Sequence, residues 1–313
     1  MKKLSIVIPV YFEENVIGVI YSRLKDILSR ISYNYEIIFV DDGSMDRTLE
    51  LLKEIASKDK SVKIISFSRN FGHQVAITAG IDEASGDGII LMDADMQDPP
   101  EVILEMIVKW EKGYDVVYAK RKHRIGESFF KKTTASIFYK LFNKLTDVKI
   151  PLDTGDFRLI DRKIKNDLFK MREKNRFVRG IISWLGYRQT FVEFERLKRV
   201  SGETKYPLRK MIKFAYDGIT SFSVFPLKIA LNIGFFSILI ALFLVFYAIY
   251  QYLFFPTVTI PGWTSILVAV VFFGGVQLFT IGIIGEYVGR IFEESKNRPL
   301  YIISEKINFE KDN

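Results

Sequence analysis

The fold of this chain is indicated most clearly by the stretch Gly88-Ile89-Ile90-Leu91-Met92-Asp93-Ala94-Asp95-Met96-Gln97-Asp98. Its first half is a short apolar run of the kind that forms one buried strand of a parallel sheet. Three carboxylates follow where that strand should end. A second apolar run, ending at Val40, leads in the same way into Asp41-Asp42-Gly43-Ser44-Met45-Asp46. Open α/β sheets bind ligands outside the carboxyl ends of their strands, so the two acidic clusters indicate a shared site.

Strand and helix signals alternate outward from this stretch over residues 1–120. Apolar, β-branched runs predict five strands, at residues 4–10, 35–40, 62–67, 88–92 and 114–118. Apolar residues at helical spacing predict the helices between them, at residues 16–31, 48–56, 73–84 and 101–112. Near-continuous apolar strands joined by helices are typical of a mostly parallel α/β sheet.

The spacing of the carboxylates favours a divalent cation. Asp93 and Asp95 stand two residues apart on one turn, and no basic residue lies beside them. Like charges held close together are costly without a cation. Hard oxygen ligands of this kind suit Mg²⁺ or Mn²⁺, held by one or two carboxylates and the phosphates of a substrate. A single aspartate could instead form a turn or cap a helix, as we expect of Asp46 before Thr48.

Composition excludes several classes of protein. The 313 residues suggest about two structural units. A hydrophobic share of 49% and a charged share of 26% exclude a disordered or fibrous chain. With no Cys, there is no disulfide scaffold, Cys-based zinc site or thiol nucleophile. With only His73 and His123, a multi-histidine metal centre and a Ser-His hydrolase are disfavoured.

A long uncharged block predicts a membrane anchor. Residues 229–285 contain no Asp, Glu, Lys or Arg over 57 positions. A spanning helix needs about 20 apolar residues, so the block holds two candidates, at about 229–254 and 265–288. Pro256 and Pro261 break the chain between them, and Tyr252 and Trp263 suit a membrane interface. The alternative is a buried helical hairpin in a soluble core, which two such long helices disfavour.

Flanking charge predicts the orientation of this anchor. Residues 196–228 carry eight basic residues and two acidic ones, and basic residues also follow the second span, whereas the loop between the spans is uncharged. By the positive-inside rule both ends face the cytoplasm. Residues 207–227 predict one or two amphipathic helices on the inner leaflet, with a plain connector helix as the alternative. The N-terminus enters a strand without a signal-peptide core.

These features predict four parts and a location. They are a catalytic domain at 1–195, a juxtamembrane segment at 196–228, two spans within 229–288 and a cytoplasmic tail at 289–313. We expect a multi-pass protein of the cell membrane, with the catalytic domain and both termini in the cytoplasm. The formal charge of +8 is concentrated beside the spans, which favours anionic lipid and phosphorylated ligands over nucleic acid.

The ordered motifs resemble one enzyme family along nearly the whole chain. They are Ile8-Pro9-Val10-Tyr11-Phe12-Glu13-Glu14, Asp41-Asp42-Gly43-Ser44, Arg69-Asn70-Phe71-Gly72-His73-Gln74, Asp93-Ala94-Asp95, Gly155-Asp156-Phe157-Arg158-Leu159, Trp184-Leu185-Gly186-Tyr187, Gly285-Glu286-Tyr287-Val288-Gly289-Arg290 and Arg298-Pro299-Leu300-Tyr301. The chain thus resembles inverting family-2 glycosyltransferases with a nucleotide-sugar-binding α/β domain (GT-A type, Rossmann-like). Within them it is similar to polyprenyl-phosphate glycosyltransferases, including bactoprenol glucosyltransferases and, more distantly, dolichyl-phosphate mannose synthases.

The resemblance implies roles for individual residues. It places the nucleoside at Asp41 and Asp42, with Pro9, Tyr11 and Glu13 lining the same pocket. It makes Asp93 and Asp95 the ligands of the divalent ion, with Gln97 as a further candidate, and it puts Asp156 in the position of the general base. A phosphate acceptor is largely dianionic at pH 7, so we expect Asp156 to orient the acceptor or contact the metal–donor complex rather than remove a proton.

A phosphate acceptor approaching a diphosphate sugar also needs cations. We expect Arg121, after the fifth strand, to be the most important, and Arg69 to contact phosphate, with a surface ion pair as its alternative role. Bidentate arginine suits phosphate geometry. His73 is assigned no catalytic role, and the basic loop at residues 120–132, with His123, is a candidate lid. The candidates for the acceptor phosphate are Lys122, Arg199, Lys205 and Arg209, with Arg124 a further possibility.

The resemblance predicts transfer of one sugar from a nucleotide sugar to polyprenyl (undecaprenyl) phosphate, with inversion. UDP-glucose or UDP-N-acetylglucosamine is the expected donor, and GDP-mannose, as in the dolichyl-phosphate mannose synthases, is an alternative. A processive synthase would carry a Gln-x-x-Arg-Trp motif and more spans, and Trp184 has no such partner. A membrane-anchored nucleotide-sugar binder without catalysis is the alternative from another class. The anchor is compatible with a homo-oligomer.

Overall fold

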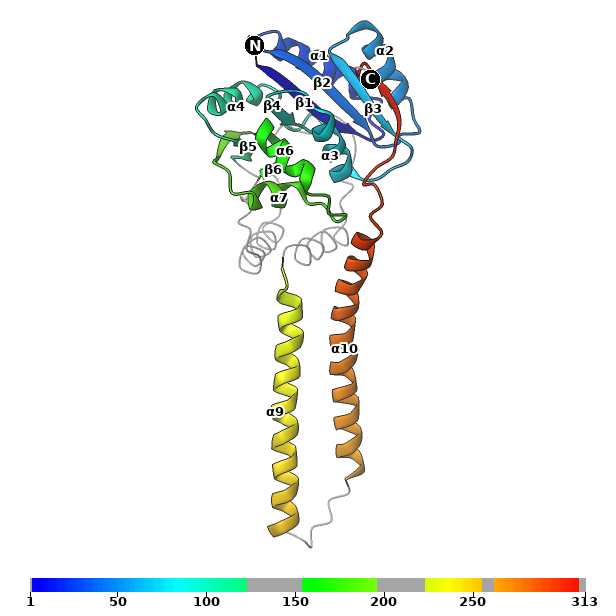
Figure 1. The fold of residues 1–313 in the computed structure, drawn as a ribbon, viewed down its shortest axis with the longest axis vertical. Coiled ribbons are helices and arrows are strands. Elements are labelled where there is room, and N and C mark those ends of the chain that lie inside the picture. Colours follow the sequence, from blue (N-terminus) through cyan, green and yellow to red (C-terminus); the bar gives the residue numbers. More distant parts are fainter. Residues whose placement is uncertain (1, 123–153, 196–222, 255–261, 310–313) are drawn as a thin grey trace. The chain divides into compact units, whose positions relative to one another are not determined.

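The computed structural model describes residues 2–122, 154–195, 223–254 and 262–309, and the chain forms two compact units (Figure 1). The first unit takes in residues 1–212 together with residues 298–313, and the second takes in residues 213–297. The chain therefore leaves the first unit, forms the second and returns. The segment expected as a cytoplasmic tail, residues 289–313, is divided between the two units.

The described part of the first unit is built on one eight-stranded sheet, in the order β7-β5-β6-β4-β1-β2-β3-β8. The strands are β1 (Lys3–Val10), β2 (Asn34–Asp41), β3 (Val62–Phe67), β4 (Gly88–Leu91), β5 (Val116–Arg121), β6 (Thr154–Asp161), β7 (Gln189–Phe194) and β8 (Ile303–Ile307). The central strands β4, β1, β2 and β3 are parallel, as the sequence predicts, whereas β6 and β8 run antiparallel to their neighbours.

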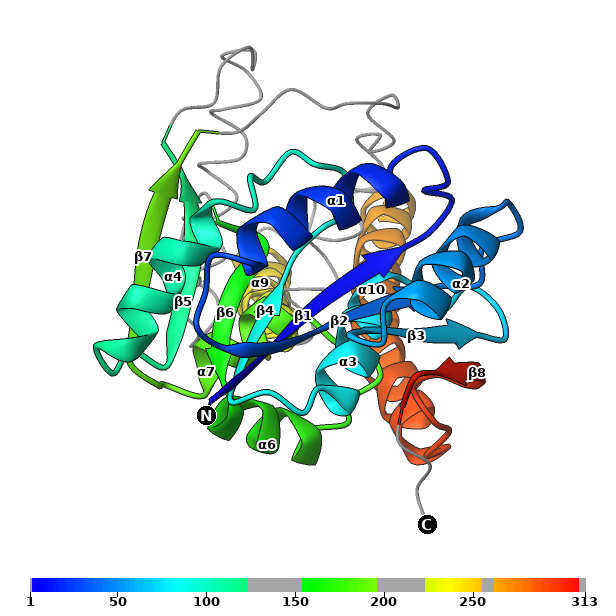
Figure 2. The same ribbon diagram turned by 90° about the horizontal axis from the view of Figure 1, so that it is seen from above.

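Helices cover both faces of this sheet. They are α1 (Ile17–Leu28), α2 (Thr48–Lys58), α3 (His73–Glu83), α4 (Val102–Glu111), α6 (Arg162–Lys170) and α7 (Val178–Trp184). Figure 2 shows α1, α2 and α4 on one face and α3, α6 and α7 on the other. In α1, the apolar residues at helical spacing, Ile17, Ile20, Leu24 and Ile27, are all buried, which is the amphipathic pattern that predicts the helix.

The helix cap predicted at Asp46 and the position of the last strand both differ slightly from the structure. The carboxylate of Asp46 accepts a hydrogen bond from Thr48 N at 3.1 Å, so it satisfies an N-terminal amide of α2 as a cap would, although Arg47 precedes the helix directly. The apolar residues at 300–303 predict a further strand that returns from the second span, and β8 lies a few residues later, at Ile303–Ile307. It adds an antiparallel edge to β3.

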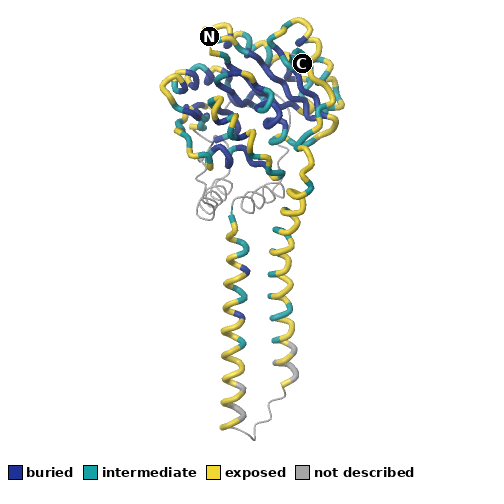
Figure 3. The backbone as a smooth tube through the Cα atoms, viewed as in Figure 1, coloured by how far each residue is buried: buried dark blue, intermediate teal, exposed yellow. Residues whose placement is uncertain are grey.

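The described part of the second unit consists of two long helices, α9 (Phe225–Phe254) and α10 (Trp263–Ser295). Both are long and apolar enough to cross a membrane, with a mean hydropathy that reaches 2.6 within Phe225–Tyr247 and 2.1 within Val268–Ser295. Their apolar side chains lie mostly exposed along the helices (Figure 3). That exposure argues against the alternative of a hairpin buried in a soluble core. Both helices extend beyond the spans predicted from charge alone.

Several predictions fall on residues outside the described ranges. They include the lid loop with His123 and Arg124, and most of the juxtamembrane segment. The acceptor-phosphate candidates Arg199, Lys205 and Arg209 also lie there. The side chains of Tyr252 and Trp263, expected at a membrane interface, are likewise not described.

Candidate active site

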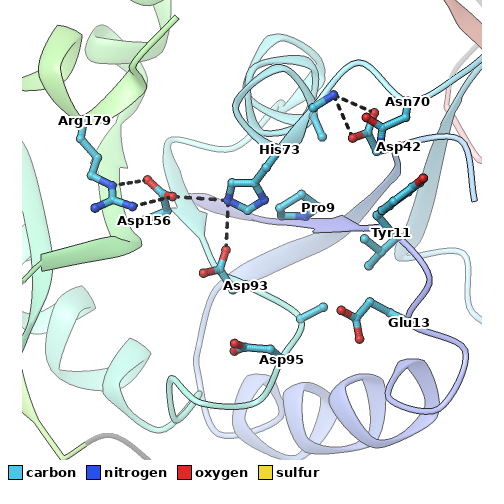
Figure 4. A pocket seen from close by; sticks show the side chains of 14 residues that line it. Pro9, Tyr11, Glu13, Asp42, Asn70, His73, Asp93, Asp95, Asp156 and Arg179 are labelled. Atoms are coloured by element: carbon cyan, nitrogen blue, oxygen red, sulfur yellow. Dashed lines mark hydrogen bonds and ion pairs between the residues drawn. The ribbon is translucent and has the colours of Figure 1, made fainter. Parts of the chain in front are cut away.

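A cavity of about 520 Å³ opens at the carboxyl edge of the parallel strands (Figure 4). Its volume is within the range of ligand and cofactor pockets. Because β6 runs antiparallel to β4, its first residues lie at this same edge and bring Asp156 into the cavity. The lining residues are Pro9, Val10, Tyr11, Glu13, Asp42, Asn70, Gly72, His73, Ala76, Asp93, Ala94, Asp95, Asp156 and Arg179.

One end of the cavity is formed by the turn that follows β2. The carboxylate of Asp42 accepts hydrogen bonds from Phe71 N at 2.6 Å and from Gly72 N at 2.9 Å. Burial raises the pKa of Asp42, and the two backbone hydrogen bonds oppose that shift. Gly43 is required here, because its φ is +72° and a Cβ would lie 2.6 Å from the carbonyl carbon of Arg69.

Asp41 does not line the cavity, although the resemblance paired it with Asp42. Its Oδ1 accepts a hydrogen bond from Ser44 N at 3.1 Å, and its Oδ2 accepts one from the Ser66 hydroxyl at 3.0 Å. These contacts hold the turn against the end of β3. Asp41 therefore supports the turn, and Asp42 faces the ligand space.

The segment after β1 forms the adjoining wall, with Pro9, Tyr11 and Glu13 lining the cavity as expected. The Tyr11 ring packs on Phe12 at 4.3 Å between centroids and remains 43% exposed. The backbone of this segment is held to the start of α2, since Glu13 N donates to the Thr48 hydroxyl at 2.9 Å. An exposed aromatic ring on a fixed backbone suits contact with a planar ligand group.

The other end of the cavity holds a cluster of three titratable side chains. His73 Nε2 lies 3.3 Å from Asp93 Oδ1 and 3.3 Å from Asp156 Oδ2 (Figure 4). The three come from the start of α3, the turn after β4 and the start of β6, so they meet only in the folded chain. Asp95 lines the same cavity.

The charges in this cluster perturb one another. Burial alone would lower the pKa of His73, but its hydrogen bond to Asp156 and the charge of Asp93 raise that pKa to about 9. Burial raises the pKa of Asp93, against the attraction of His73. Burial would also raise the pKa of Asp156, yet Arg179 and His73 hold it well below its usual range.

Arg179 and Gln74 fix the orientation of Asp156. Arg179 donates from Nε to Oδ1 of Asp156 at 2.7 Å and from Nη2 to Oδ2 at 3.0 Å, which is the bidentate geometry that guanidinium favours. Gln74 Nε2 donates to Oδ2 at 3.2 Å, and Gln74 Oε1 accepts from Val178 N at 3.1 Å. The Asp156 side chain is 6% exposed, so its two oxygens are held rather than mobile.

The residues present fit a divalent cation. His73, Asp93 and Asp156 each offer a ligand atom, and among the described residues these three atoms lie within 4.8 Å of one another. Asp93 Oδ1 is buried and, apart from its ion pair with His73 at 3.3 Å, has no hydrogen-bond partner among the described residues. Carboxylate oxygens suit Mg²⁺ and Mn²⁺, and an imidazole must lose its proton before it can bind a metal. Asp93 and Asp156 would hold such an ion, with His73 as a neighbouring cation or a further ligand. Asp95, the other ligand that the resemblance implies, lines the same cavity.

Besides Asp41, four of the predicted residues that the structure describes lie outside the cavity lining. Gln97 donates its backbone N–H to Asp95 Oδ1 at 3.1 Å, so it supports that turn. Arg69 is exposed, and its guanidinium lies 4.0 Å from the centre of the Phe71 ring. Arg121 Nη2 lies 4.0 Å from Asp98 Oδ1, and Lys122 is exposed at the end of the described range.

Three polar side chains of the cavity lining, Asn70, His73 and Arg179, are not among the predicted site residues, and the signals for them differ. His73 and Asn70 follow β3, so the rule that predicts the two acidic clusters applies to them as well and would have found them. Arg179 lies on α7, 23 positions after Asp156 in sequence. Its place depends on how β6 and α7 pack, which no local pattern shows.

Fold and site together define an α/β enzyme of the GT-A type, with carboxylates at the carboxyl edge of a central parallel sheet. Residues 5–169 match the model of the family described as Glycosyl transferase family 2. The chain belongs to this family, which confirms the resemblance seen in the motifs. It is a glycosyltransferase.

Relatives of the chain match it over nearly its full length. The glycosyltransferase YkcC of Bacillus subtilis is 53% identical over 306 residues, covering 98% of this chain and 94% of its own. The bactoprenol glucosyl transferase of Shigella phage SfV is 44% identical over 301 residues, covering 96% and 98%. Among solved structures, mannosyl-3-phosphoglycerate synthase from Rubrobacter xylanophilus is 18% identical over 70% of this chain and 72% of its own, with a TM-score of 0.47.

Proposed function

We propose that this chain transfers a single sugar from a nucleotide sugar to polyprenyl phosphate, with inversion, at the cytoplasmic face of the cell membrane. One observation carries the proposal. A single cavity joins Asp42, at the position of the nucleoside, to Asp93 and Asp156, on a chain with two apolar helices. The relative named bactoprenol glucosyl transferase is similar across the same span of sequence, including both helices.

The donor is proposed to be UDP-glucose, with UDP-N-acetylglucosamine next. Support for glucose comes from the names of the phage relatives, which are bactoprenol glucosyl transferases at 41–44% identity. In the proposed complex the nucleoside lies along Tyr11 and Asp42, and the sugar lies toward Asp156. GDP-mannose is the competing donor, and a panel of donors distinguishes the two.

The proposed reaction is one displacement. A phosphate oxygen of the acceptor forms a bond to the anomeric carbon as the bond from that carbon to the nucleoside diphosphate breaks, from the opposite face. A divalent ion bound at Asp93 and Asp95 would offset the negative charge that develops on the leaving diphosphate. The residues of this chain bind the nucleoside, hold the sugar and exclude water.

Asp156 is proposed to orient the reacting groups rather than to accept a proton. Its pKa is held well below the usual range by Arg179 and His73, so it is a weak base at pH 7. The acceptor needs no strong base, because a phosphate monoester has its second pKa near 6. Placement of the reacting atoms is itself a large catalytic effect.

A lipid-phosphate transfer assay tests the proposal. Membranes that contain the full chain are incubated with Mg²⁺ or Mn²⁺, undecaprenyl phosphate and one labelled donor, chosen in turn from UDP-glucose, UDP-N-acetylglucosamine and GDP-mannose. We expect a glucosyl lipid from the first, with the configuration at the anomeric carbon inverted. Asp93→Asn should abolish it, and Asp26→Asn, the same change at an exposed site on α1, should not. Binding of donor without any product would favour the non-catalytic binder.

The orientation has its own test, since the natural chain has no Cys. A single Cys replaces Thr259, between the spans, or Ser57, which is exposed on α2. A membrane-impermeant maleimide should label Thr259→Cys in intact cells, and Ser57→Cys only after permeabilisation. Labelling of Ser57→Cys in intact cells would reverse the proposed orientation.

A further inference from the structure

The C-terminal segment at residues 298–309, here called the C-terminal strap, lies against the strand that leads into the cavity. Its strand β8 pairs antiparallel with β3, with a register shift between Ser66 and Phe67. Beyond that shift, Ser68 N donates a hydrogen bond to Ile302 O at 3.0 Å. The strap therefore follows β3 to its carboxyl end, where the β3–α3 loop begins.

An aromatic contact connects the strap to that loop. The Tyr301 ring stacks on Phe67, with centroids 5.3 Å apart and an angle of 15° between the rings. Phe67 in turn meets the edge of Phe71 at 5.6 Å, and Phe71 lies under the Arg69 guanidinium at 4.0 Å. Three rings and one cation thus form a continuous stack from the strap into the loop.

The loop held by this stack supplies part of the cavity wall. Phe71 N and Gly72 N are the two donors to the Asp42 carboxylate, and Asn70 and Gly72 line the cavity directly. Gly72 has a φ of +104°, a conformation that favours glycine, and among the described residues no atom beyond its chain neighbours lies within 4 Å of where its Cβ would be. Its backbone is held by the hydrogen bond from Gly72 N to the Asp42 carboxylate at 2.9 Å.

Tyr301 also holds the other side of the loop. Its hydroxyl donates to Asp82 Oδ2 at 2.8 Å, near the end of α3, the helix that begins at His73. Arg172 Nη1 pairs with the same oxygen at 2.7 Å, and the Asp82 side chain is 5% exposed. A single side chain of the strap therefore contacts the strand before the loop and the helix after it.

We propose that Tyr301 is a positioning residue for the nucleotide donor, and that the C-terminal strap is a part of the donor site. By holding Phe67 and α3, Tyr301 keeps the amides of Phe71 and Gly72 directed at Asp42. The inference deepens the proposed function and rests on it for the identity of the nucleotide. The strap follows α10 directly in sequence, so the second apolar helix is covalently continuous with a support of the donor site.

The test compares variants at the two ends of the β3–β8 pair in the full chain in detergent. Tyr301→Ala removes the stack, Tyr301→Leu keeps apolar volume without an aromatic ring, and Tyr301→Phe keeps the ring without the hydrogen bond to Asp82. Asn308→Ala is the matched control, because Asn308 Nδ2 donates to Ala56 O and Val62 O, both at 2.8 Å, at the end of β3 far from the loop. Hydrogen exchange of residues 68–74 and the Kd for UDP with Mn²⁺ are measured for each.

We expect Tyr301→Ala and Tyr301→Leu to speed exchange of residues 68–74 by tenfold or more and to raise the Kd for UDP about tenfold. Tyr301→Phe keeps the ring stack but loses the contact with α3, so both readouts should fall between those of the natural chain and Tyr301→Ala. Asn308→Ala should leave both readouts unchanged even where it lowers Tm. Unchanged exchange in both Tyr301→Ala and Tyr301→Leu overturns the proposal, and so does an equal rise in Kd in Asn308→Ala. Faster exchange in a chain that never binds UDP supports the positioning role and overturns the proposed nucleotide.

Discussion

Arg179 donates to both oxygens of Asp156, at 2.7 Å from Nε and 3.0 Å from Nη2, and both side chains line the cavity. The guanidinium also donates from Nη1 to Thr154 O at 3.1 Å, so it ties the start of β6 to α7. An ion pair of this geometry makes the carboxylate a weak proton acceptor and a well-fixed hydrogen-bond acceptor. The effect of this ion pair on catalysis can be measured with substitutions at either residue.

The first prediction concerns Asp156→Asn. The asparagine keeps the shape of the side chain but loses the charge that Arg179 and His73 hold, and we expect kcat to fall about 100-fold. If Asp156 orients groups, the loss is the same at every pH from 5 to 9. The measurement is the pH profile of kcat for transfer to the lipid phosphate. Recovery of the variant's rate at high pH would instead identify Asp156 as the general base.

A second prediction concerns Arg179. Lysine keeps the positive charge but cannot donate to both carboxylate oxygens at once, whereas glutamine removes the charge. We expect Arg179→Lys to lose about tenfold in kcat and Arg179→Gln about 100-fold, the range seen when the partner of a site residue is removed. Arg188, whose guanidinium lies over Tyr114, offers the control substitution Arg188→Lys. Equal rates for Arg179→Lys and the natural chain would contradict the need for bidentate contact.

Much of the fold could be predicted because its strands carry local signals. Strands β1 to β4 are apolar on both faces, and their bounds match the predicted runs within one or two residues. Strand β6 was missed because it carries Asp156 and Arg158 on one face, and buried charges are not expected in a central strand. The guanidinium of Arg179 compensates the charge of Asp156. The partner that compensates this buried charge lies 23 positions away in the sequence, so no pattern within the strand reveals it.

The site residues could be predicted where an acidic side chain directly follows the end of a predicted strand. Asp93 and Asp95 are acidic, adjacent to a strand end and close in sequence, so a local pattern reveals them. Asp41 has the same local signals as Asp42 and still does not line the cavity, because only the fold shows that Ser44 and Ser66 engage it. His73 reaches the cluster because it is the first residue of α3. The sequence around His73 does not show that Asp156 will lie beside it in the fold.

The third prediction separates Asp41 from Asp42, two neighbouring residues with different surroundings. Asp42→Asn removes the charged acceptor of two amides in the β3–α3 loop, Phe71 N and Gly72 N, and alters the cavity wall. We expect the KM for the donor to rise about tenfold, since a hydrogen bond to a charged group contributes about 1.5–3 kcal/mol. Asp41→Asn should lower Tm and change that KM less than about twofold. Steady-state kinetics and thermal melts on both variants check this, and a higher KM in Asp41→Asn alone would reverse the assignment.

The fourth prediction concerns metal removal. Treatment with EDTA should abolish transfer, and either Mg²⁺ or Mn²⁺ should restore it, because the carboxylates of Asp93 and Asp95 are ligands that both ions accept. His73→Gln should lower the affinity for the metal ion about 10- to 100-fold, as loss of a neighbouring group does at metal sites. Titration of activity against the metal concentration measures this. Full activity in EDTA would exclude a role for a divalent ion.

The last prediction concerns stability at the opposite edge of the sheet, where Glu36 is 1% exposed. Lys3 and Lys63 each pair with its Oε2 at 2.8 Å, and the Ser5 hydroxyl donates to its Oε1 at 2.6 Å. Burial would raise the pKa of Glu36, but these partners lower it from 4.5 to about 2.

Because the folded pKa of Glu36 lies below the unfolded value, its contribution is present above pH 4.5 and is lost as the pH falls toward 2. The shift corresponds to about 3 kcal/mol at neutral pH. Glu36→Gln should therefore lower Tm clearly at pH 7, and the difference from the natural chain should narrow between pH 4.5 and 3. Thermal melts of both chains in detergent across this range measure it. A difference in Tm that stays constant with pH would show that Glu36 acts through packing and not through its charge.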